Sequence, residues 1–538
     1  MTDIPLPAAR TLAGVVAEQA IRTPNRPAIL HDEEIISYAE LVARTERAAR
    51  ALLAAGIAPG DRIGVLLGND PDWVMLALAA SRLDVTFVPL NTWYKQTELA
   101  WTLTHCALKL VVAAPRFIKT DYIDLFRKVV PEALGAAIGG VASPAFPELK
   151  TLVFTGDAPG LASLDDLLKL GDGLPATALD AVVADPGQPA FVLYTSGSTA
   201  DPKGVMLAHR GVVENGFELG LRRGITGEDR VWLGTPLFYG LGATNALPAT
   251  FTRGATLVLQ GHFDAGRAIE VVHRTRATVY YGTGNMTRAM LDHPDYTRAK
   301  IGSLEKGNAG TVAEYKRMTL VEMGISGAVP AYGLTETYGN ATVGWPDDPL
   351  EAKLETSGTP LAGMEMRIVD PVTRRDLKQG ETGLVLIRGH TTTGYLDNPV
   401  ETAKVIDADS FFDTGDLGFF DADGRFHFHA RLKEVIKSGG INVSPVEVEQ
   451  LIARHPDVRD AYVVGVAHPV RGELVVAFVD AAVEMTGSDV QAYVKERAAS
   501  FKVPHHVFFR HEERLPRLAS GKVAKHKLAE EARAELGL

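Results

Sequence analysis

The sequence predicts an α/β protein whose large N-terminal domain holds parallel or mixed sheets with helices, followed by a small α+β C-terminal domain. Three observations support this. Apolar strand-like runs alternate with helical segments between residues 62 and 281. The pattern changes near residue 431, and the 538 residues exceed what one hydrophobic core usually serves. We therefore expect one domain at 1–430 and another at 431–538.

The clearest unit of the large domain begins at Arg62. Arg62–Leu67 has the pattern of a buried strand, and Pro71 is well placed to open a helix over Trp73–Ser81. Val85–Val88 returns as a strand, which gives a βαβ unit and favours a parallel sheet. Similar apolar runs recur at Leu152–Phe154, Phe191–Tyr194, Ala255–Leu259 and Thr278–Tyr281.

The last ~110 residues predict a compact module of another kind. A helix over Pro445–Ala453 would start at a Ser444 cap. We expect the remaining elements to be two strands, a helix and a final strand, at Ala461–Val466, Leu474–Asp480, near Val490–Ala499 and near His506–Phe509.

Bulk properties exclude several classes of function. A net charge of −11 and a pI near 5.8 argue against binding a nucleic acid polymer or anionic lipid. The single cysteine, Cys106, is interpreted as a buried inert thiol rather than a nucleophile. The segment Met1–Arg10 lacks the pattern of a signal peptide, and Arg82 and Asp84 interrupt the most apolar stretch. We expect no membrane span and a cytoplasmic protein.

A hydroxyl-rich segment after the strand at Phe191–Tyr194 predicts a phosphate site. Small residues and hydroxyls with flexible backbone can form a concave nest for anions, and a lysine adds a positive charge. Taken alone, the composition is also that of a flexible loop, and the spacing does not fit a Walker loop. The candidate phosphate-binding residues are Thr195, Ser196, Gly197, Ser198, Thr199 and Lys203.

The order Tyr-Thr-Ser-Gly-Ser-Thr followed by Pro-Lys-Gly resembles the signature loop of the ANL superfamily of adenylate-forming enzymes, which includes acyl-CoA synthetases. The segment Tyr332–Thr337 resembles the second nucleotide motif of that superfamily. The resemblance implies that Tyr332, beside Gly333, packs on adenine and that Thr335 contacts phosphate. It also implies that Glu336, with Thr199, holds Mg²⁺. An isolated Thr-Glu pair would otherwise indicate a helix N-terminus.

Three later segments continue the resemblance. Asp416 matches the residue that binds the ribose hydroxyls, and Arg431 would contact ribose and phosphate. Lys433 would be the hinge of a mobile C-terminal domain, and Lys522 would reach into the site during adenylation. Without the resemblance, the basic residues at 431–437 would indicate a solvated helix face. The resemblance places the pantetheine channel of coenzyme A along Lys437, Gly439 and Gly440.

Some positions depart from the superfamily pattern. Ala430 replaces a common Gly, Lys525 a frequent Arg, and Tyr239 a frequent His. Asn308 interrupts the usual Gly-Gly of the adenine-contacting segment, whose predicted nucleotide-binding residues are Gly307, Asn308 and Ala309. These changes bear on pocket shape, and none removes a charge that the reaction needs.

The resemblance implies that the chain activates a carboxylic acid with ATP and Mg²⁺ and transfers the acyl group to coenzyme A. The alternatives are a stand-alone enzyme that loads a carrier-protein thiol and, less favoured, a luciferase-like oxygenase or a non-catalytic nucleotide sensor. The resemblance implies that the acyl pocket is lined by Phe238–Leu247, Tyr281–Met286 and Gly307–Thr311, and the small and apolar residues of these segments predict a roomy pocket for a hydrophobic or bulky monocarboxylate. A homodimer is left open. The predicted substrate residues are Phe238, Tyr239, Gly242, Tyr281, Gly282, Gly284 and Gly310.

Overall fold

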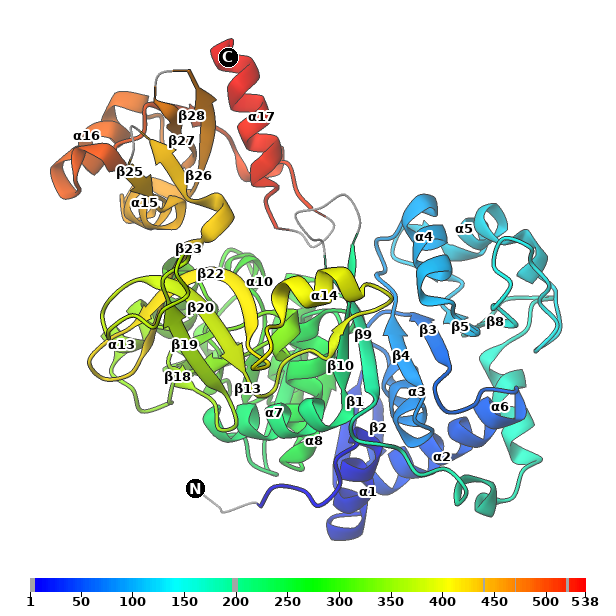
Figure 1. Ribbon diagram of the computed structural model, residues 1–538. Helices are drawn as coiled ribbons and strands as arrows, with labels where there is room; N and C mark the ends of the chain where they lie inside the picture. Colours follow the sequence, from blue (N-terminus) through cyan, green and yellow to red (C-terminus); the bar gives the residue numbers. More distant parts are fainter. Residues whose placement is uncertain (1–4, 196–201, 439–440, 470, 519–521) are drawn as a thin grey trace.

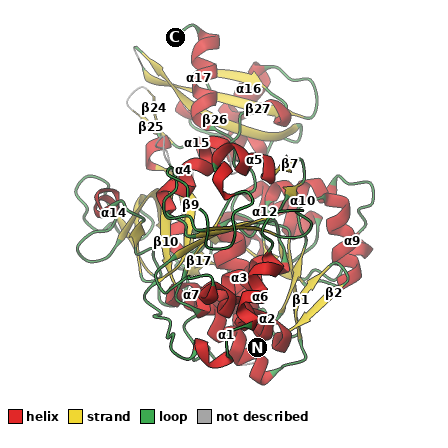
Figure 2. Ribbon diagram, turned by 90° about the vertical axis from the view of Figure 1, so that its right-hand side faces the viewer, coloured by secondary structure: helices red, strands yellow, loops and turns green. Residues whose placement is uncertain are grey.

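The computed structural model describes residues 5–195, 202–438, 441–469, 471–518 and 522–538. Figure 1 shows a large N-terminal part, coloured blue to yellow, with a small C-terminal part, orange to red, above one end of it. Figure 2 shows the same two parts from the side.

The first large sheet contains the predicted βαβ unit. The strands β3 (Arg62–Leu66) and β4 (Thr86–Pro89) run parallel, and α3 (Pro71–Arg82) connects them. Asp70 caps α3, with Pro71 in its first turn, so the helix begins where Pro costs no hydrogen bond. Across the sheet the order is β21 (Gly394–Tyr395), β10 (Lys203–Ala208), β9 (Pro189–Thr195), β4, β3, β5 (Leu110–Ala113) and β8 (Thr151–Phe154).

The second large sheet is parallel except at its β1–β2 edge. Its buried strands carry runs of Val, Leu and Tyr, as expected for strands covered on both faces. The order is β15 (Gly327–Val329), β14 (Lys306–Asn308), β13 (Val279–Tyr281), β11 (Arg230–Leu233), β12 (Thr256–Leu259), β1 (Pro27–His31) and β2 (Glu34–Ser37).

One hydrophobic core joins the two sheets through the helices between them, and Trp73, Leu52 and Phe251 lie in it, buried from solvent. Burial of each such side chain stabilises the folded protein by about 1.5–3 kcal/mol. The helices of this layer, beside α3, are α1 (Leu12–Arg22), α2 (Tyr38–Ala54), α7 (His209–Arg222) and α8 (Leu247–Thr252).

Separate cores cover the outer faces. The first sheet packs there against α4 (Gln96–Cys106) and α5 (Tyr122–Val129), and the second against α9 (Ala265–Thr275), α10 (Gly284–Leu291) and α11 (Arg298–Ile301). The remaining helices of the large part are α6 (Leu164–Asp172), α12 (Ala313–Arg317), α13 (Leu350–Glu355) and α14 (Pro399–Val405).

Two smaller antiparallel sheets complete the large part. One contains β16 (Ala331–Tyr332), β17 (Thr342–Val343) and β18 (Thr359–Pro360). The other contains β19 (Glu365–Val369), β20 (Gly383–Arg388), β22 (Phe412–Phe420) and β23 (Phe426–Arg431). A short two-stranded ribbon pairs β6 (Arg116–Phe117) with β7 (Thr120–Asp121).

The C-terminal part begins after β23 ends at Arg431. Its sheet packs against α15 and α16 on one face and against α17 on the other. The elements are β24 (Ile436–Ser438), β25 (Ile441–Val443), α15 (Pro445–Ala453), β26 (Val458–His468), β27 (Gly472–Ala481), α16 (Gly487–Arg497), β28 (His506–Phe509) and α17 (Lys525–Leu536).

The predicted fold class is confirmed. Ser444 caps α15 as expected, its hydroxyl accepting from the backbone N–H of Glu447. The solvated-helix interpretation of residues 431–437 is wrong: this segment is the end of β23, a 3₁₀ turn at Leu432–Glu434 and the start of β24. Among the described residues, no helix has the length and apolarity needed to cross a bilayer.

Candidate active site

The predicted phosphate loop joins two paired strands. Thr195 ends β9 and Lys203 begins β10, and the two residues are partners in the antiparallel register. The chain therefore leaves the sheet after Thr195 and re-enters it beside that residue, at Lys203. The predicted Ser196, Gly197, Ser198 and Thr199 lie outside the described residues.

Lys203 has a defined environment. Its ammonium nitrogen Nζ lies 2.8 Å from Oε2 of Glu401, which belongs to α14, and 4.9 Å from the ring centre of Tyr395. Lys203 and Lys404 together lower the pKa of Glu401 to about 2, through hydrogen bonds to its carboxylate. Lys203 is thus a fixed positive charge at the first position of β10, directly after the loop.

Glu336 and Thr335 lie on a 3₁₀ turn, Thr335–Thr337, after β16. The Glu336 residue is 9% exposed, and the hydroxyl of Tyr395 donates to its Oε1 at 3.0 Å. The Glu336 carbonyl accepts from the N–H of Thr392 at 2.6 Å. Burial raises the pKa of Tyr395, with the Glu336 charge acting in the same direction, so the phenol remains a donor. A hydrogen bond from Tyr395 on strand β21 therefore fixes the orientation of the Glu336 carboxylate.

Tyr332 and Asp416 meet on neighbouring sheets. The Tyr332 hydroxyl donates to Oδ2 of Asp416 at 2.7 Å, and its ring packs against Phe426 with ring centres 4.6 Å apart. Gly333 follows directly, and a Cβ there would come within 2.5 Å of the Cα of Asn340. A side chain at this position would collide with backbone, so only glycine fits.

Asp416 is buried and also faces Arg431. The Arg431 Nε lies 3.2 Å from its Oδ1, and the two residues are partners across β22 and β23. Burial raises the pKa of Asp416, whereas Arg431 and the Tyr332 hydroxyl act in the opposite direction. Among the described residues, this ion pair is the contact of the buried Oδ1, and no donor reaches it with hydrogen-bond geometry. An acceptor of this kind suits a hydroxyl-bearing ligand.

Lys522 of the C-terminal part lies close enough to Arg431 and Asp416 for their charges to act on its ammonium group. The backbone N–H of Leu518 donates to the Lys522 carbonyl at 2.8 Å, which closes the loop before α17. Lys522 keeps an exposed surface, yet protein surrounds it closely enough that desolvation lowers the pKa of its ammonium group. The charge of Arg431 acts in the same direction, and Asp416 opposes it. Two domains therefore bring charged groups to one place.

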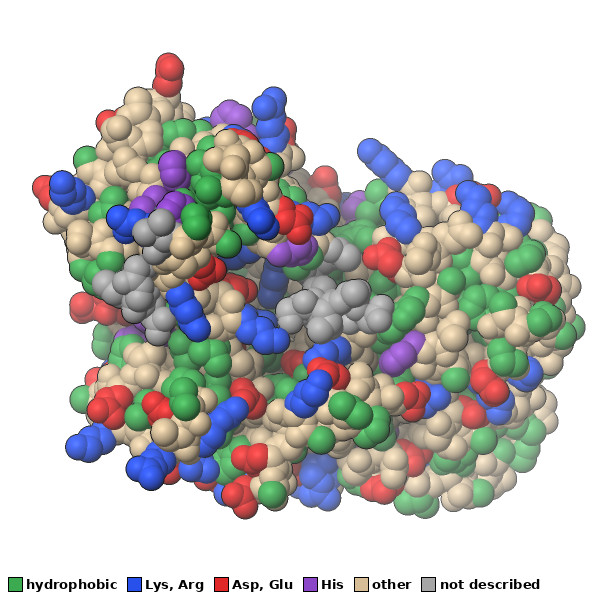
Figure 3. All heavy atoms as spheres, turned by 45° about the horizontal axis from the view of Figure 1, so that its top comes forward, with side chains coloured by type: hydrophobic (Ala, Val, Ile, Leu, Met, Phe, Trp, Pro, Cys, Tyr) green, Lys and Arg blue, Asp and Glu red, His purple; other side chains and the backbone are tan. Residues whose placement is uncertain are grey.

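Figure 3 shows the molecule from the C-terminal side, with lysine and arginine side chains where the small lobe meets the large one. Lys433 lies in the turn between β23 and β24, with an exposed side chain. Lys437 lies on β24, and its backbone N–H donates to Glu473. Within the described residues, Lys437 makes no hydrogen bond or ion pair with the nucleotide candidates above. Gly439 and Gly440 lie outside the described residues.

The segment predicted to contact adenine packs tightly on β13. Gly307 has φ +134°, and a Cβ there would lie 2.1 Å from the Tyr280 carbonyl oxygen. Asn308 donates to the Gly282 carbonyl at 3.2 Å and accepts from the Gly310 N–H at 3.3 Å. Where the superfamily commonly has a glycine, Asn308 thus connects two segments predicted for substrate. Ala309 is buried beside it.

The predicted acyl residues form an aromatic cluster with a residue that the sequence analysis missed. Trp93, 45% exposed, packs edge-on against Phe238 and Tyr239, with ring centres 5.6 and 5.9 Å apart. Burial raises the pKa of Tyr239. Gly242 lies in a π-helical segment, Leu241–Ala246, and a Cβ there would come within 2.6 Å of the Pro236 carbonyl oxygen. Such π-helical turns are frequent at functional sites.

A buried arginine also lies behind this region. Arg223 is fully buried and donates to Asn245, to the hydroxyl of Tyr281 and to Asn340. Among the described residues it has no carboxylate partner, and its charge is stabilised by these polar groups and by the ring of Tyr281, whose centre lies 4.5 Å from its guanidinium carbon. This network ties Tyr281 to the π-helical segment. No periodic or motif signal in the sequence distinguishes Arg223 from a surface residue.

Two glycines of the predicted acyl pocket allow neighbouring tyrosine side chains to pack against the backbone. The ring of Tyr315 would lie 2.0 Å from a Cβ at Gly284, and the Tyr280 hydroxyl 2.2 Å from one at Gly282. The space gained by omitting these side chains is filled by tyrosines. At these two positions glycine therefore makes room for tyrosine side chains and does not by itself indicate an open pocket.

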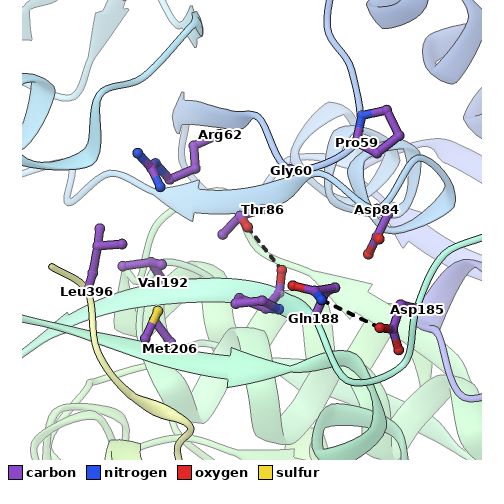
Figure 4. A pocket seen from close by; sticks show the side chains of 11 residues that line it. Pro59, Gly60, Arg62, Asp84, Thr86, Asp185, Gln188, Val192, Met206 and Leu396 are labelled. Carbon is purple, nitrogen blue, oxygen red and sulfur yellow. Dashed lines mark hydrogen bonds between the residues drawn. The ribbon is translucent and has the colours of Figure 1, made fainter. Parts of the chain in front are cut away.

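A cavity of about 460 Å³ lies elsewhere on the first sheet (Figure 4). Arg62, Asp84, Asp185 and Met206 are among its lining residues, and none of the predicted site residues lines it. Asp84 is engaged with His209, 3.6 Å away, which lowers the pKa of Asp84. The cavity is therefore separate from the candidate site.

Cys106 is buried and not in a disulfide. Burial raises the pKa of its thiol to about 12, and its Sγ lies 2.9 Å from the Tyr194 hydroxyl. A thiol in this state is a poor nucleophile, as the sequence analysis expected.

The arrangement suits chemistry on a polyanion. Lys203, Arg431 and Lys522 offer positive charge, Asp416 offers an acceptor, and Glu336 offers a single fixed carboxylate. Among the described residues, no group of three or more His, Cys, Asp or Glu side chains could hold a metal ion. A metal here would need ligands from its substrate, as Mg²⁺ commonly takes from phosphates.

Comparison with known proteins agrees with this geometry. The family described as AMP-binding enzyme matches residues 16–396, and the AMP-binding enzyme C-terminal domain matches residues 447–522. The chain is 33% identical to 3-[(3aS,4S,7aS)-7a-methyl-1,5-dioxo-octahydro-1H-inden-4-yl]propanoyl:CoA ligase of Mycobacterium tuberculosis, covering 97% of this chain and 99% of that one. It is 31% identical to the mitochondrial medium-chain acyl-CoA ligase ACSF2 of Danio rerio, covering 96% and 87%.

Solved structures share the fold over nearly the whole chain. ATP-bound MatB from Rhodopseudomonas palustris matches with a TM-score of 0.84 at 27% identity, covering 98% of this chain and 99% of that one. The anthranilate CoA ligase AuaEII in complex with anthranoyl-AMP matches with a TM-score of 0.85 at 23% identity, covering 100% and 99%.

Proposed function

The chain belongs to the AMP-binding enzyme family, and from this premise we propose that it activates a hydrophobic or bulky monocarboxylic acid with ATP and transfers the acyl group to coenzyme A. The prediction of an AMP-forming acid–thiol ligase is confirmed by acyl-CoA ligase relatives that align along almost the whole chain. The observation that carries the proposal is the convergence of Tyr332, Asp416 and Arg431 with Lys522 from the second domain.

Nucleotide binding is assigned to the residues whose geometry suits each part of ATP. Asp416, whose buried Oδ1 lies in an ion pair with Arg431 and accepts no hydrogen bond among the described residues, would accept from the ribose. Arg431 would contact ribose and phosphate. Tyr332 and the segment Gly307–Ala309 would border the adenine. Lys203 and the loop that begins at Thr195 would contact the phosphates, because cationic and N–H donors stabilise phosphate oxygens.

Glu336 fits a role in holding Mg²⁺. Its carboxylate is buried, and a hydrogen bond from Tyr395 holds one of its oxygens in place. Hard cations prefer carboxylate oxygens as ligands. Thr335 lies on the same turn, where it would contact phosphate. Bound Mg²⁺ would offset the negative charge of the phosphates.

The chain's own contribution to acyl-adenylate formation is electrostatic. Acid and ATP are both anions, so their approach needs fixed positive charge. Lys522 would pair with the substrate carboxylate and the ester oxygen that forms from it. The desolvation that lowers its pKa also strengthens such a contact, because the surroundings screen charge less than water does.

Thioester formation would use a second arrangement of the same two domains. Lys433 lies between the last strand of the large part and the first strand of the small one, where a change in backbone angles would swing the small domain. The segment from Lys437 through Gly440 would then replace Lys522 and line the channel for the pantetheine arm. A carrier-protein thiol is the alternative acceptor.

The acyl pocket is assigned to Phe238, Tyr239, Tyr281 and the segments around Gly242, Gly282–Gly284 and Gly310. Aromatic and apolar side chains there favour a hydrophobic acid. Two relatives have names that specify a medium-chain acid and a bicyclic propanoate. We extend that class to this chain. The cytoplasmic location and the homodimer stay predictions.

The test supplies ATP, Mg²⁺ and a panel of medium-chain, alicyclic and aromatic acids, with and without coenzyme A. Pyrophosphate release is measured, and products are identified by mass spectrometry. Acyl-CoA formation supports the proposal. An acyl-adenylate that forms and is not transferred to coenzyme A indicates a carrier protein instead, and no pyrophosphate with any acid contradicts adenylation of this class.

A further inference from the structure

Tyr395 lies between two groups of opposite charge in the candidate site. Its hydroxyl donates to Oε1 of Glu336 at 3.0 Å, and its ring centre lies 4.9 Å from the ammonium nitrogen of Lys203. The residue is 6% exposed. One side chain therefore contacts both the predicted metal ligand and the predicted phosphate ligand.

The backbone holds Tyr395 firmly. Strand β21 pairs with β10, where Tyr395 is the partner of Val205. The Tyr395 N–H donates to the hydroxyl of Thr402 on α14 at 2.9 Å. The same helix supplies Glu401, whose Oε2 lies 2.8 Å from the Lys203 nitrogen. Strand and helix thus fix the tyrosine relative to both charges.

Lys203 and Glu336 carry opposite charges, yet no ion pair joins them among the described residues. An ammonium and a carboxylate in a poorly hydrated site attract strongly, and an ion pair between them would neutralise both. In the structure Lys203 forms an ion pair with Glu401, and Oε1 of Glu336 accepts a hydrogen bond from Tyr395. Among the described residues, no protein donor binds the other oxygen, Oε2, of Glu336.

We propose that Tyr395 is a positioning residue that orients the Glu336 carboxylate toward Mg²⁺. This inference rests on the proposed function. Outer-shell donors of this kind typically change metal affinity 10- to 100-fold when they are removed. The aromatic ring supports the lysine, and the hydroxyl orients the carboxylate, so a single substitution can separate the two effects.

The test uses Tyr395→Phe, which keeps the ring and removes the hydroxyl. Binding of ATP to the full-length protein is measured by calorimetry across a Mg²⁺ titration, and again in EDTA without the metal. We expect the apparent affinity for Mg²⁺ to fall about tenfold or more, while ATP binding in EDTA changes less than about twofold. Tyr38→Phe is the matched control. It removes a buried phenol that donates to the Ala255 carbonyl at 2.7 Å, where neither residue belongs to the candidate site, and should leave both titrations unchanged.

A double-mutant cycle with Glu336→Gln makes the test specific. If Tyr395 acts through Glu336, Tyr395→Phe should add no further loss of Mg²⁺ affinity in the Glu336→Gln background. An unchanged Mg²⁺ titration, equal losses with and without the metal, or full additivity in the cycle would each overturn the proposal. Failure of the wild-type protein to bind ATP at all would instead count against the proposed function.

Discussion

The hydroxyl of Tyr332 donates a 2.7 Å hydrogen bond to Oδ2 of Asp416, a residue 84 positions later in the chain. The bond joins β16 to β22 and leaves the other carboxylate oxygen, Oδ1, facing Arg431. Burial and the Asp416 charge raise the pKa of Tyr332, so the phenol stays protonated and keeps donating. The pair therefore presents a fixed acceptor at the proposed nucleotide site.

Asp416→Asn should weaken ATP binding while leaving the fold intact. The substitution keeps the shape of the side chain and removes the charge that would accept from the ribose hydroxyls. Hydrogen bonds to charged groups contribute about 1.5–3 kcal/mol, so the KM for ATP should rise about 10- to 100-fold. Steady-state kinetics with varied ATP measure this.

Tyr332→Phe is the companion variant to Asp416→Asn. It keeps the ring that packs on Phe426 and removes only the donor, so its effect on the KM for ATP should be the smaller of the two. A larger effect from Tyr332→Phe than from Asp416→Asn would show that the carboxylate is not the ribose ligand.

Lys522→Ala should impair the first half-reaction selectively. The lost contact is one preorganised charge on the developing acyl-adenylate, which is typically worth about 10²–10³ in rate. Transfer from a supplied acyl-adenylate to coenzyme A should change far less. Lys527→Ala, an exposed lysine of α17, is the control and should leave both rates unchanged. Equal losses in the two half-reactions would refute the role of Lys522.

Local sequence signals predicted the elements well. The helix at Pro445–Ala453 and the strand at His506–Phe509 have the predicted bounds, because a cap, a proline and an apolar run act within a few residues. The βαβ unit from Arg62 was predicted for the same reason. The motif residues Tyr332, Asp416, Arg431 and Lys522 came from the superfamily resemblance, and the structure brings them together.

Contacts between distant segments were not predictable. Tyr395 reaches Glu336 across 59 positions and Arg223 reaches Asn340 across 117, through strand pairing and core packing that no local pattern records. The segment at 431–437 shows the same limit. Its charge pattern suits a solvated helix, yet pairing with β22 and β25 makes its two ends strands.

Lys433→Pro should damage one half-reaction and spare the other. Proline fixes its own φ and restricts the residue before it, so the turn at Leu432–Glu434 could no longer change its backbone angles freely. The two half-reactions are measured separately, as for Lys522. Lys433→Ala removes the side chain without restricting the backbone and should affect both rates little. Unchanged kinetics in the proline variant would argue against a swing at this position.

Cys106 should resist alkylation while the protein is folded. Its thiol pKa of about 12 means that the reactive thiolate is scarce at pH 8, and the side chain is fully buried. Iodoacetamide labelling, followed by mass spectrometry, should proceed only after denaturation. Rapid labelling of the native protein would show that the thiol is accessible and contradict the structural assignment.

Lys316 on α12 should make the free energy of unfolding depend on pH in the alkaline range. It is buried, and desolvation lowers its pKa to about 7 from the ordinary 10.5. Its ammonium nitrogen donates to the carbonyls of Thr356 at 2.7 Å and Leu354 at 3.3 Å, with no carboxylate partner among the described residues. The folded chain therefore loses this proton near pH 7, whereas the unfolded chain keeps it until pH 10.5.

Between those two pH values the unfolded state binds more protons, so this residue makes the free energy of unfolding rise with pH, by up to about 1.4 kcal/mol per unit. Below pH 7 both states are protonated, and the penalty of burying the charge is fully present. Lys316→Met, which keeps the volume and removes the amine, should flatten the slope between pH 7.5 and 9.5. Urea unfolding of both proteins at several pH values measures the difference. Identical slopes would mean that the buried lysine keeps its charge in the folded protein, held by its two carbonyl acceptors.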